Sequence, residues 1–346
     1  MSLDEAAQLL SFFPAFKDAS LSLVSGGLIN QTYLARTGER EDQKLILQRI
    51  NPIFNKDVCK DIDALTQYLD AKRLRTPKVV RTKDNALYVE TKEQRTWRAL
   101  TFIEGKTHHI VRDGRHAHAA GALVAAFHKA LEDFDYTHVF SRGNVHHLQT
   151  HVDVLHKALQ EHKDHRLYNA LSPLAEQLLK AIDGLPSFED LPLRFAHGDL
   201  KISNILFDDD DQGICLVDLD TTSKMIWPFE MGDAFRSWCN PGREDEQCAF
   251  DLKRFTGGLF GYASVFSDVK PTEHERLVDG IACITLELSA RFLADALNES
   301  YFGFDGGRFA TRGEHNLARA KGQFALYQSL HAQRDAAQKL VQEAFG

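Results

Sequence analysis

The hydrophobic pattern of this 346-residue chain changes its period near residue 105. Before that point, "LSLVSGGLINQTYLAR" and "QKLILQRI" are short apolar runs separated by glycine or polar breaks, which is typical of strands. Beyond it, "RHAHAAGALVAAFHKALEDF" begins a series of long segments with helical spacing. A chain of this length also needs more than one core, because single cores stop growing near ~250–300 residues. We therefore predict an α+β, bilobal fold, with a small β-rich N-lobe and a large, mostly helical C-lobe.

The pattern sets the boundary between the lobes at residues 104–106, giving an N-lobe over 1–104 and a C-lobe over 105–346. In the N-lobe, the spacing predicts one helix over 56–72. The runs "KVVRT" and "ALYVE" are predicted to pair as a hairpin around "KDN". In the C-lobe, a strand-like segment over 193–222 interrupts the helices.

Charge and cysteine content exclude several classes of protein. The net charge of −8 argues against a general nucleic-acid binder, which usually has a basic face. The five cysteines have no CxxC spacing, so we expect a reducing, cytoplasmic environment and no disulfide framework or zinc site. The first residues carry acids and no basic leader, and no apolar run reaches the ~20 residues that span a bilayer. We expect no membrane partner.

Most of the sixteen histidines lie between His108 and His165. Such a cluster raises the question of a metal site. No pair has HExxH spacing, and the neighbouring acids are not placed as ligands. We interpret these histidines as exposed residues of helix faces.

The stretch "HGDLKISNILFD", residues 197–208, followed by "VDLD", carries the chemistry. Phosphoryl transfer from ATP needs a carboxylate that accepts the proton of the attacking hydroxyl and oxygen ligands for Mg²⁺. Asp199 is the candidate base, and Asn204 is a candidate Mg²⁺ ligand. A hairpin with the acidic tip "DDDDQG" would return the chain so that Asp218 supplies a second ligand.

This stretch resembles the catalytic loop of the aminoglycoside phosphotransferase and choline kinase group of the protein-kinase-like fold, which has HGD where protein kinases have HRD. The resemblance implies that ATP lies under the turn containing Gly26 and Gly27 and that Arg49 steadies the phosphates. It also implies that Lys201 reaches the transferred phosphate. The acid that pairs with Arg49 is left open, with Asp61 favoured over Asp57 and Asp63.

A narrower resemblance covers residues 24–330 through "GGLINQTYL", "LILQRIN", "VDLDT" and "EHNLARAKGQFAL". These segments look like the N-acetylhexosamine 1-kinases, which phosphorylate the anomeric hydroxyl of N-acetylated hexosamines. The resemblance implies sugar contacts from Thr221, Arg319, Tyr301 and Arg236. For Arg236 a structural pairing with Asp233 or another acid is the alternative.

The resemblance implies an ATP- and Mg²⁺-dependent small-molecule kinase, with a sugar as its partner. Two alternatives stay open: a kinase for another alcohol, such as an aminoglycoside, a choline-like compound or homoserine, and a non-catalytic protein of the same fold. The sequence leaves the exact acceptor, the choice of ATP or GTP and the oligomeric state undecided.

Overall fold

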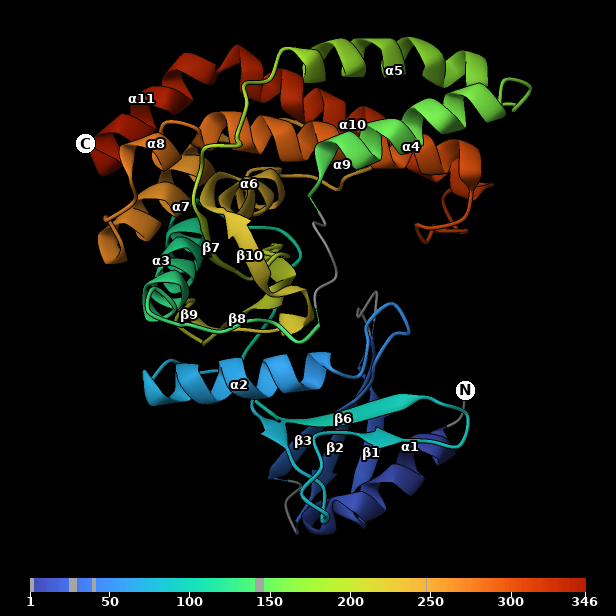
Figure 1. The fold of residues 1–346 in the computed structure, drawn as a ribbon, viewed down its shortest axis with the longest axis vertical. Helices are drawn as coiled ribbons and strands as arrows, with labels where there is room; N and C mark the ends of the chain where they lie inside the picture. The colour runs from blue at the N-terminus through green and yellow to red at the C-terminus, as the bar shows by residue number, and fades with distance from the viewer. Residues whose placement is uncertain (1–2, 25–29, 39–41, 141–145, 247) are drawn as a thin grey trace. The chain divides into compact units, whose positions relative to one another are not determined.

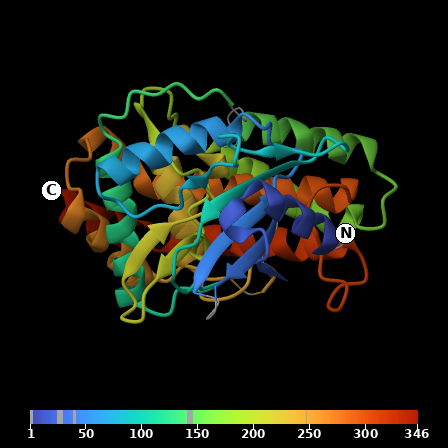
Figure 2. The same ribbon diagram turned by 90° about the horizontal axis from the view of Figure 1, so that it is seen from below.

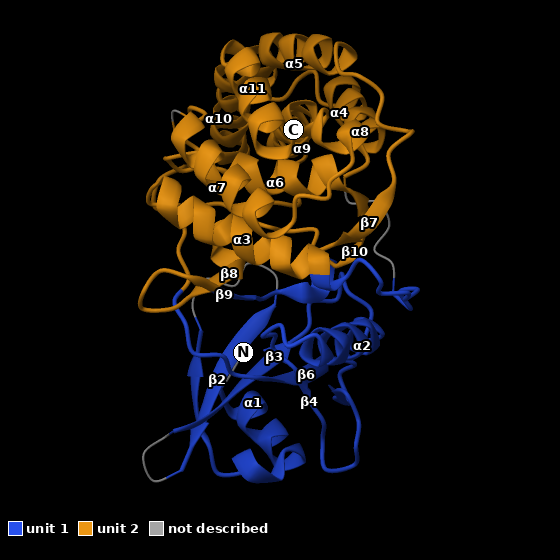
Figure 3. Cartoon of the chain, turned by 90° about the vertical axis from the view of Figure 1, so that its left-hand side faces the viewer, with its two compact units in different colours: residues 1–106, 130–143, 214–221 blue, residues 107–129, 144–213, 222–346 orange. Residues whose placement is uncertain are grey.

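The computed structural model describes residues 3–24, 30–38, 42–140, 146–246 and 248–346. It confirms the α+β class, because an antiparallel sheet lies in the N-terminal part and helices dominate the rest. The chain divides into two compact units, shown in different colours in Figure 3. Unit 1 comprises 1–106, 130–143 and 214–221, and unit 2 comprises 107–129, 144–213 and 222–346.

Unit 1 is built on an antiparallel sheet of order β1-β2-β3-β6-β4, in which β5 also pairs with β6. Its strands are β1 (Ser20–Leu23), β2 (Gln31–Thr37), β3 (Gln43–Arg49), β4 (Val79–Val80), β5 (Val89–Glu90) and β6 (Thr96–Thr101). The prediction that "KVVRT" and "ALYVE" pair with each other as a hairpin is wrong. The turn between them exists, with the N–H of Thr82 donating to the carbonyl of Ala86, but β4 and β5 each pair with β6.

Helix α1 (Leu3–Leu9) packs on this sheet (Figure 2). Its apolar side chains share a core with residues of β2, β3 and β6, among them Tyr33, Leu47 and Trp97, which are at most 2% exposed. This burial of apolar surface is the main favourable contribution to the stability of the sheet.

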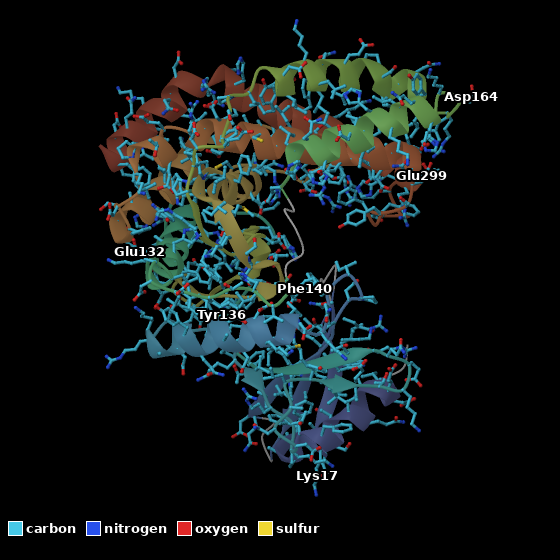
Figure 4. The ribbon with its side chains drawn as sticks, viewed as in Figure 1. Lys17, Glu132, Tyr136, Phe140, Asp164 and Glu299 are labelled. Carbon is cyan, nitrogen blue, oxygen red and sulfur yellow. The ribbon has the colours of Figure 1, made fainter. Side chains whose placement is uncertain are left out.

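Helix α2 (Val58–Ala71) lies where the spacing predicted it. Its Asp61 is only 3% exposed and accepts hydrogen bonds from the Tyr136 hydroxyl (2.8 Å) and from the N–H groups of Val139 (2.7 Å) and Phe140 (2.9 Å). Figure 4 labels Tyr136 and Phe140 on this segment of unit 1. Asp61 therefore joins α2 to a segment that follows it by more than seventy residues in the chain. How Arg49 is paired remains a prediction.

Unit 2 is mostly helical (Figure 1). Its long helices are α3 (Gly114–Ala130), α4 (Leu148–Glu161), α5 (Tyr168–Asp183), α6 (Trp227–Trp238), α7 (Leu252–Val265), α9 (Leu277–Asn298), α10 (Arg312–Ala332) and α11 (Arg334–Phe345). Helices α10 and α11 follow one another directly and are separated only by Gln333. A short helix α8 (Pro271–His274) precedes α9, and β7 (Leu193–Ala196) pairs antiparallel with β10 (Ser223–Ile226).

Helix α9 is the central element of unit 2, and α4, α5, α6 and α10 pack on it. All but three of its 22 residues are buried. Because other helices surround α9, it buries polar residues as well as apolar ones. Each buried polar side chain on α9 is therefore expected to have a hydrogen-bond partner.

No helix among the described residues has the length and the apolar character that crossing a membrane requires.

Candidate functional site

The loop after β7 brings three of the predicted residues together. The Nζ of Lys201 lies 2.6 Å from the Asp199 carboxylate, and the Asn204 amide nitrogen donates to the same carboxylate (3.0 Å) and to the Asp199 carbonyl (2.8 Å). Asn204 ends a short 3-10 helix, η3 (Ile202–Asn204). The Asp199 side chain is 22% exposed, so a proton-accepting carboxylate is held in one orientation and remains reachable from solvent.

Helix α6 holds this loop in place. Both oxygens of Glu230 accept backbone N–H groups, one from His197 (2.7 Å) and one from Gly198 (3.0 Å). One helical turn later, Asp233 accepts the N–H of Leu200 (3.1 Å). The backbone of Gly198 has φ of 78°, a conformation that favours glycine. Glu230 was not expected from the sequence, and Asp233 was expected only as a partner of Arg236, although two acids three residues apart in the apolar segment "WPFEMGDAF" are a recognisable signal.

Burial raises the pKa of the Glu230 carboxyl, but His128 and the His197 N–H outweigh it and hold that pKa below its usual value of 4.5. Glu230 is therefore an anion that binds the loop with charge-assisted hydrogen bonds. The His197 ring itself is fully buried and lies against Phe127. This placement fits a bracing role for His197.

Arg236 is committed to two acids. Its guanidinium pairs with Asp233 (2.9 Å) and Glu244 (3.0 Å), and its side chain is 9% exposed. Burial lowers the pKa of Arg236, and the two carboxylates raise it by more. These contacts match the structural alternative that the sequence left open for Arg236.

The other predicted acceptor contacts of unit 2 lie around the end of α9. The Arg319 guanidinium donates to the Gly303 carbonyl (2.8 Å) and lies over the ring of Phe292. Tyr301 is 58% exposed. Asp295, another residue that the sequence analysis missed, accepts the N–H groups of Ser300, Tyr301 and Phe302 and so shapes this loop.

In unit 1, Arg49 ends β3, opposite Gln31 of β2 and Trp97 of β6. Gly26 and Gly27 lie outside the described residues. Asp218 has φ of 66°, in the left-handed region that residues other than glycine rarely adopt. Such strain is common at functional sites. Thr221 ends the short helix η4 (Leu219–Thr221).

A buried ion pair fixes the segment that carries Asp218 and Thr221. Asp220, whose side chain is fully buried, accepts from both terminal nitrogens of Arg98 on β6 and from the amide of Asn30. Gln48 accepts from the same guanidinium (2.8 Å). Burial lowers the pKa of Arg98, and Asp220 more than restores it. The sequence analysis missed this pair, although an arginine inside the apolar run "WRALTF" requires a buried partner.

The His-rich segment forms no metal cluster within the described part of the chain. The interpretation as exposed helix faces is wrong for part of it, because His116, His128 and His146 are at most 7% exposed. His128 contacts Glu230 (3.4 Å) and His146 contacts Glu287 (3.2 Å). His128 and His146 thus lie beside buried acids, a pairing that sequence spacing alone does not reveal.

Comparison with known proteins agrees with the phosphoryl-transfer chemistry predicted for the loop that carries Asp199. Residues 20–265 match the model of the phosphotransferase enzyme family. A homoserine kinase of Zymomonas mobilis subsp. mobilis is 24% identical over 282 residues, covering 80% of this chain and 81% of that protein.

Solved structures show the same fold. A microcompartment-associated aminopropanol kinase superposes with a TM-score of 0.65 at 16% identity, over 97% of this chain and 98% of that one. An amicoumacin kinase in complex with AMP-PNP and Ca²⁺ gives 0.62 at 13% identity, over 94% and 93%. The bilobal protein-kinase-like class predicted from the sequence is confirmed. The chain belongs to the phosphotransferase enzyme family and is a small-molecule kinase.

Proposed function

We propose that this enzyme transfers the γ-phosphoryl group of ATP to a hydroxyl of a small polar molecule, with Asp199 as the base. The observation that carries the proposal is the Asp199 carboxylate, accessible and held between Lys201 and Asn204 in a loop that α6 fixes. Loose phosphoryl-transfer transition states need little covalent help from the protein. Positioning and charge neutralisation account for most of the catalysis.

In this proposal Asp199 orients the acceptor hydroxyl and takes its proton. Lys201, beside the carboxylate, neutralises the charge of the transferred phosphoryl group. Arg49 and the turn containing Gly26 and Gly27 bind the phosphates of ATP. The AMP-PNP complex of the amicoumacin kinase supports an adenine nucleotide as the donor.

Asn204 and Asp218 would hold Mg²⁺, which supplies charge neutralisation at the phosphates. The donor set fits, because Mg²⁺ prefers hard oxygen ligands and takes few from the protein. The Asn204 amide nitrogen donates to Asp199, so the ligand atom would be the amide oxygen. The strained backbone of Asp218 supports a functional role for its carboxylate.

For the acceptor we propose a sugar, an N-acetylhexosamine phosphorylated at its anomeric hydroxyl. The narrower resemblance over residues 24–330 supports this choice. Thr221, Tyr301 and Arg319 are the proposed sugar contacts. For Arg236 we propose an indirect role, in which the pair with Asp233 fixes the catalytic loop.

A second candidate acceptor is an alcohol that carries an amine. The homoserine kinase of Z. mobilis and the aminopropanol kinase support it, because both names denote amine-bearing substrates.

The test is a coupled assay of ADP release with N-acetylglucosamine, glucosamine, L-homoserine, 3-amino-1-propanol, choline and kanamycin. Asp199→Asn should lower kcat by about 10²–10⁴ while Mg-ATP binding persists. Asp210→Asn, at the exposed tip of the hairpin, is the matched control and should retain full activity. Full activity of Asp199→Asn would overturn the mechanism.

A further inference from the structure

The acid that holds the catalytic loop is itself held from its other side. Oε1 of Glu230 lies 3.4 Å from Nε2 of the buried His128 on α3. Nδ1 of His128 lies 2.9 Å from the hydroxyl of Tyr262 on α7, and that hydroxyl accepts the indole N–H of Trp227, the first residue of α6 (2.9 Å). These four side chains, the Trp227 network, form a continuous series of hydrogen bonds that ends at the loop.

The direction of each hydrogen bond in the Trp227 network follows from which atoms carry hydrogen. An indole nitrogen only donates, so the Tyr262 oxygen accepts from Trp227. Tyr262 is fully buried, and its hydroxyl has no hydrogen-bond partner among the described residues besides Trp227 and Nδ1 of His128. The phenolic hydrogen is therefore donated to Nδ1, because it would otherwise be buried without an acceptor.

This direction fixes the tautomer of His128. Because Nδ1 accepts, the proton of the neutral ring sits on Nε2, which donates to Glu230 Oε1. A proton on Nδ1 would displace the hydrogen of Tyr262, which has no other acceptor in the described part of the chain. Turning the ring over would place carbon atoms at both contacts, so the two hydrogen bonds also fix its orientation.

Close contact between α3 and α7 keeps Tyr262 within reach of His128. A Cβ atom at Gly261, the neighbour of Tyr262, would overlap the carbonyl oxygen of His118 on α3. Only glycine allows two backbones to approach so closely. The position of Tyr262 relative to His128 is therefore set by contact between the helix backbones.

The His128 donor matters because the carboxylate torsion of a glutamate is soft. Three donors bind the Glu230 carboxylate: Nε2 of His128 and the backbone N–H groups of His197 (2.7 Å) and Gly198 (3.0 Å). Asp199 follows Gly198 directly, so a rotation of the Glu230 carboxylate that releases the loop also moves Asp199. A displacement of about 1 Å at a reacting group costs up to about 10²-fold in rate.

We propose that His128 and Tyr262 are positioning residues for phosphoryl transfer. Tyr262 fixes His128 as a donor at Nε2, and this donor fixes the carboxylate of Glu230 that holds the loop of Asp199. The inference rests on the proposed role of Asp199 as the base, and it extends that role to two residues of α3 and α7 that act through Glu230.

Two amide replacements separate the two ring nitrogens of His128. The glutamine amide reaches about as far as Nε2, so His128→Gln keeps a donor for Glu230. The shorter amide in His128→Asn reaches only the position of Nδ1 and leaves Glu230 without this donor.

Amide hydrogen exchange of residues 197–200, followed by mass spectrometry, measures how firmly the loop is held. We expect exchange within about twofold of wild type in His128→Gln and about tenfold faster in His128→Asn. For the compound of the acceptor panel with the highest kcat/KM, kcat should fall about tenfold in His128→Asn and be retained in His128→Gln, with the KM values for ATP and acceptor little changed.

Tyr262→Phe tests whether Tyr262 acts through His128. Without the hydroxyl, Nδ1 loses its donor and the ring is no longer fixed, so loop exchange should be about three- to tenfold faster. In the His128→Gln background the same substitution should add nothing, because the glutamine donor does not depend on Tyr262. Tyr136→Phe, which removes a hydroxyl that donates to buried Asp61 in unit 1, is the matched control and should leave loop exchange unchanged.

The tautomer has a direct spectroscopic signature. Long-range ¹H–¹⁵N NMR of the imidazole rings should show His128, assigned by the loss of its signal in His128→Gln, as a neutral ring protonated on Nε2. A signal from a ring protonated on Nδ1 would contradict the direction of the Trp227 network.

Three further results would overturn the proposal. The first is loop exchange as slow in folded His128→Asn as in wild type, and the second is an equal effect of Tyr262→Phe in both backgrounds. The third is faster exchange without a change in kcat, which would leave the network a structural role alone. If no compound of the panel is turned over, the acceptor proposal fails, and the order of the exchange rates alone supports or overturns the positioning of the loop.

Discussion

Two buried glutamates of unit 2 differ in one respect. Glu230 on α6 and Glu287 on α9 are each 1% exposed, and each contacts a buried histidine, His128 or His146. Both oxygens of Glu230 accept backbone N–H groups of the catalytic loop, whereas Glu287 has an oxygen without a partner among the described residues. A buried acid that accepts backbone N–H groups holds a segment in place, whereas a buried carboxylate oxygen without a partner costs stability.

The largest effect that would test this contrast is expected from Glu230→Gln. Glutamine offers one carbonyl oxygen and turns an NH₂ group toward a backbone N–H, so one donor of the loop loses its partner. We expect the free energy of unfolding to fall by about 2–4 kcal/mol, and kcat to fall with it, because the loop that carries Asp199 loosens. Urea unfolding and the ADP-release assay measure the two quantities. A variant as stable and active as wild type would show that Glu230 does not hold the catalytic loop in place.

A smaller loss of stability is expected from Glu287→Gln. The glutamine oxygen can still accept from His146, and the NH₂ group takes the place of the unpaired Oε2, where no donor among the described residues opposes it. We expect the free energy of unfolding to fall by about 1 kcal/mol or less. Glu343→Gln on α11, where the side chain is 50% exposed, is the control. A cost equal to that of Glu230→Gln would erase the distinction between the two acids.

The smallest effect is expected in the pH dependence of stability. This dependence should have opposite signs for Glu230, which contacts His128, and for His146, which contacts Glu287. Glu230 has a pKa below 4.5 in the folded protein, so its contribution to stability is present above pH 4.5 and is lost as pH falls through the lower value. For His146, burial lowers the pKa, but Glu287 raises it more, to a net value above 6.5. The contribution of His146 is therefore complete below pH 6.5 and is lost as pH rises through the raised value.

Urea unfolding of wild type, Glu230→Gln and His146→Gln between about pH 4 and pH 9 measures these contributions. The difference between wild type and Glu230→Gln should shrink toward the acid end, and the difference for His146→Gln should shrink toward the alkaline end. The same sign for both variants would contradict the assignment.

Local spacing in the sequence predicted the parts of the site that are close in the chain. Asp199, Lys201 and Asn204 fall within six residues, and the structure brings them into contact. The turn after β8 (Ile205–Phe207) is also as expected, with the N–H of Asp208 donating to the Gln212 carbonyl (3.0 Å). Short-range geometry depends on few residues, so the pattern was sufficient there.

Long-range partners could not be read in the same way. Asp220 is 122 residues from Arg98, and Glu230 is 33 residues from His197. A sequence shows that a buried charge needs a partner, but not which one. The predicted pairing of β4 with β5 is wrong for the same reason, because each of these strands pairs instead with β6, which lies further along the chain. The roles of the predicted site residues stay predictions, for Asp199, Lys201, Asn204 and Arg236 as well as for Gly26, Gly27, Arg49, Asp218, Thr221, Tyr301 and Arg319.

The hydrogen bonds that residues 136–140 donate to Asp61 have a consequence for how this fold can be exchanged between genes. The unit that contains the sheet also draws on residues 130–143 and 214–221, so it is assembled from three separate stretches of chain. A stretch ending near residue 104 lacks two of its parts. A gene fusion or recombination event that moved this stretch alone would transfer an incomplete module, so the two units must be acquired and diversified together.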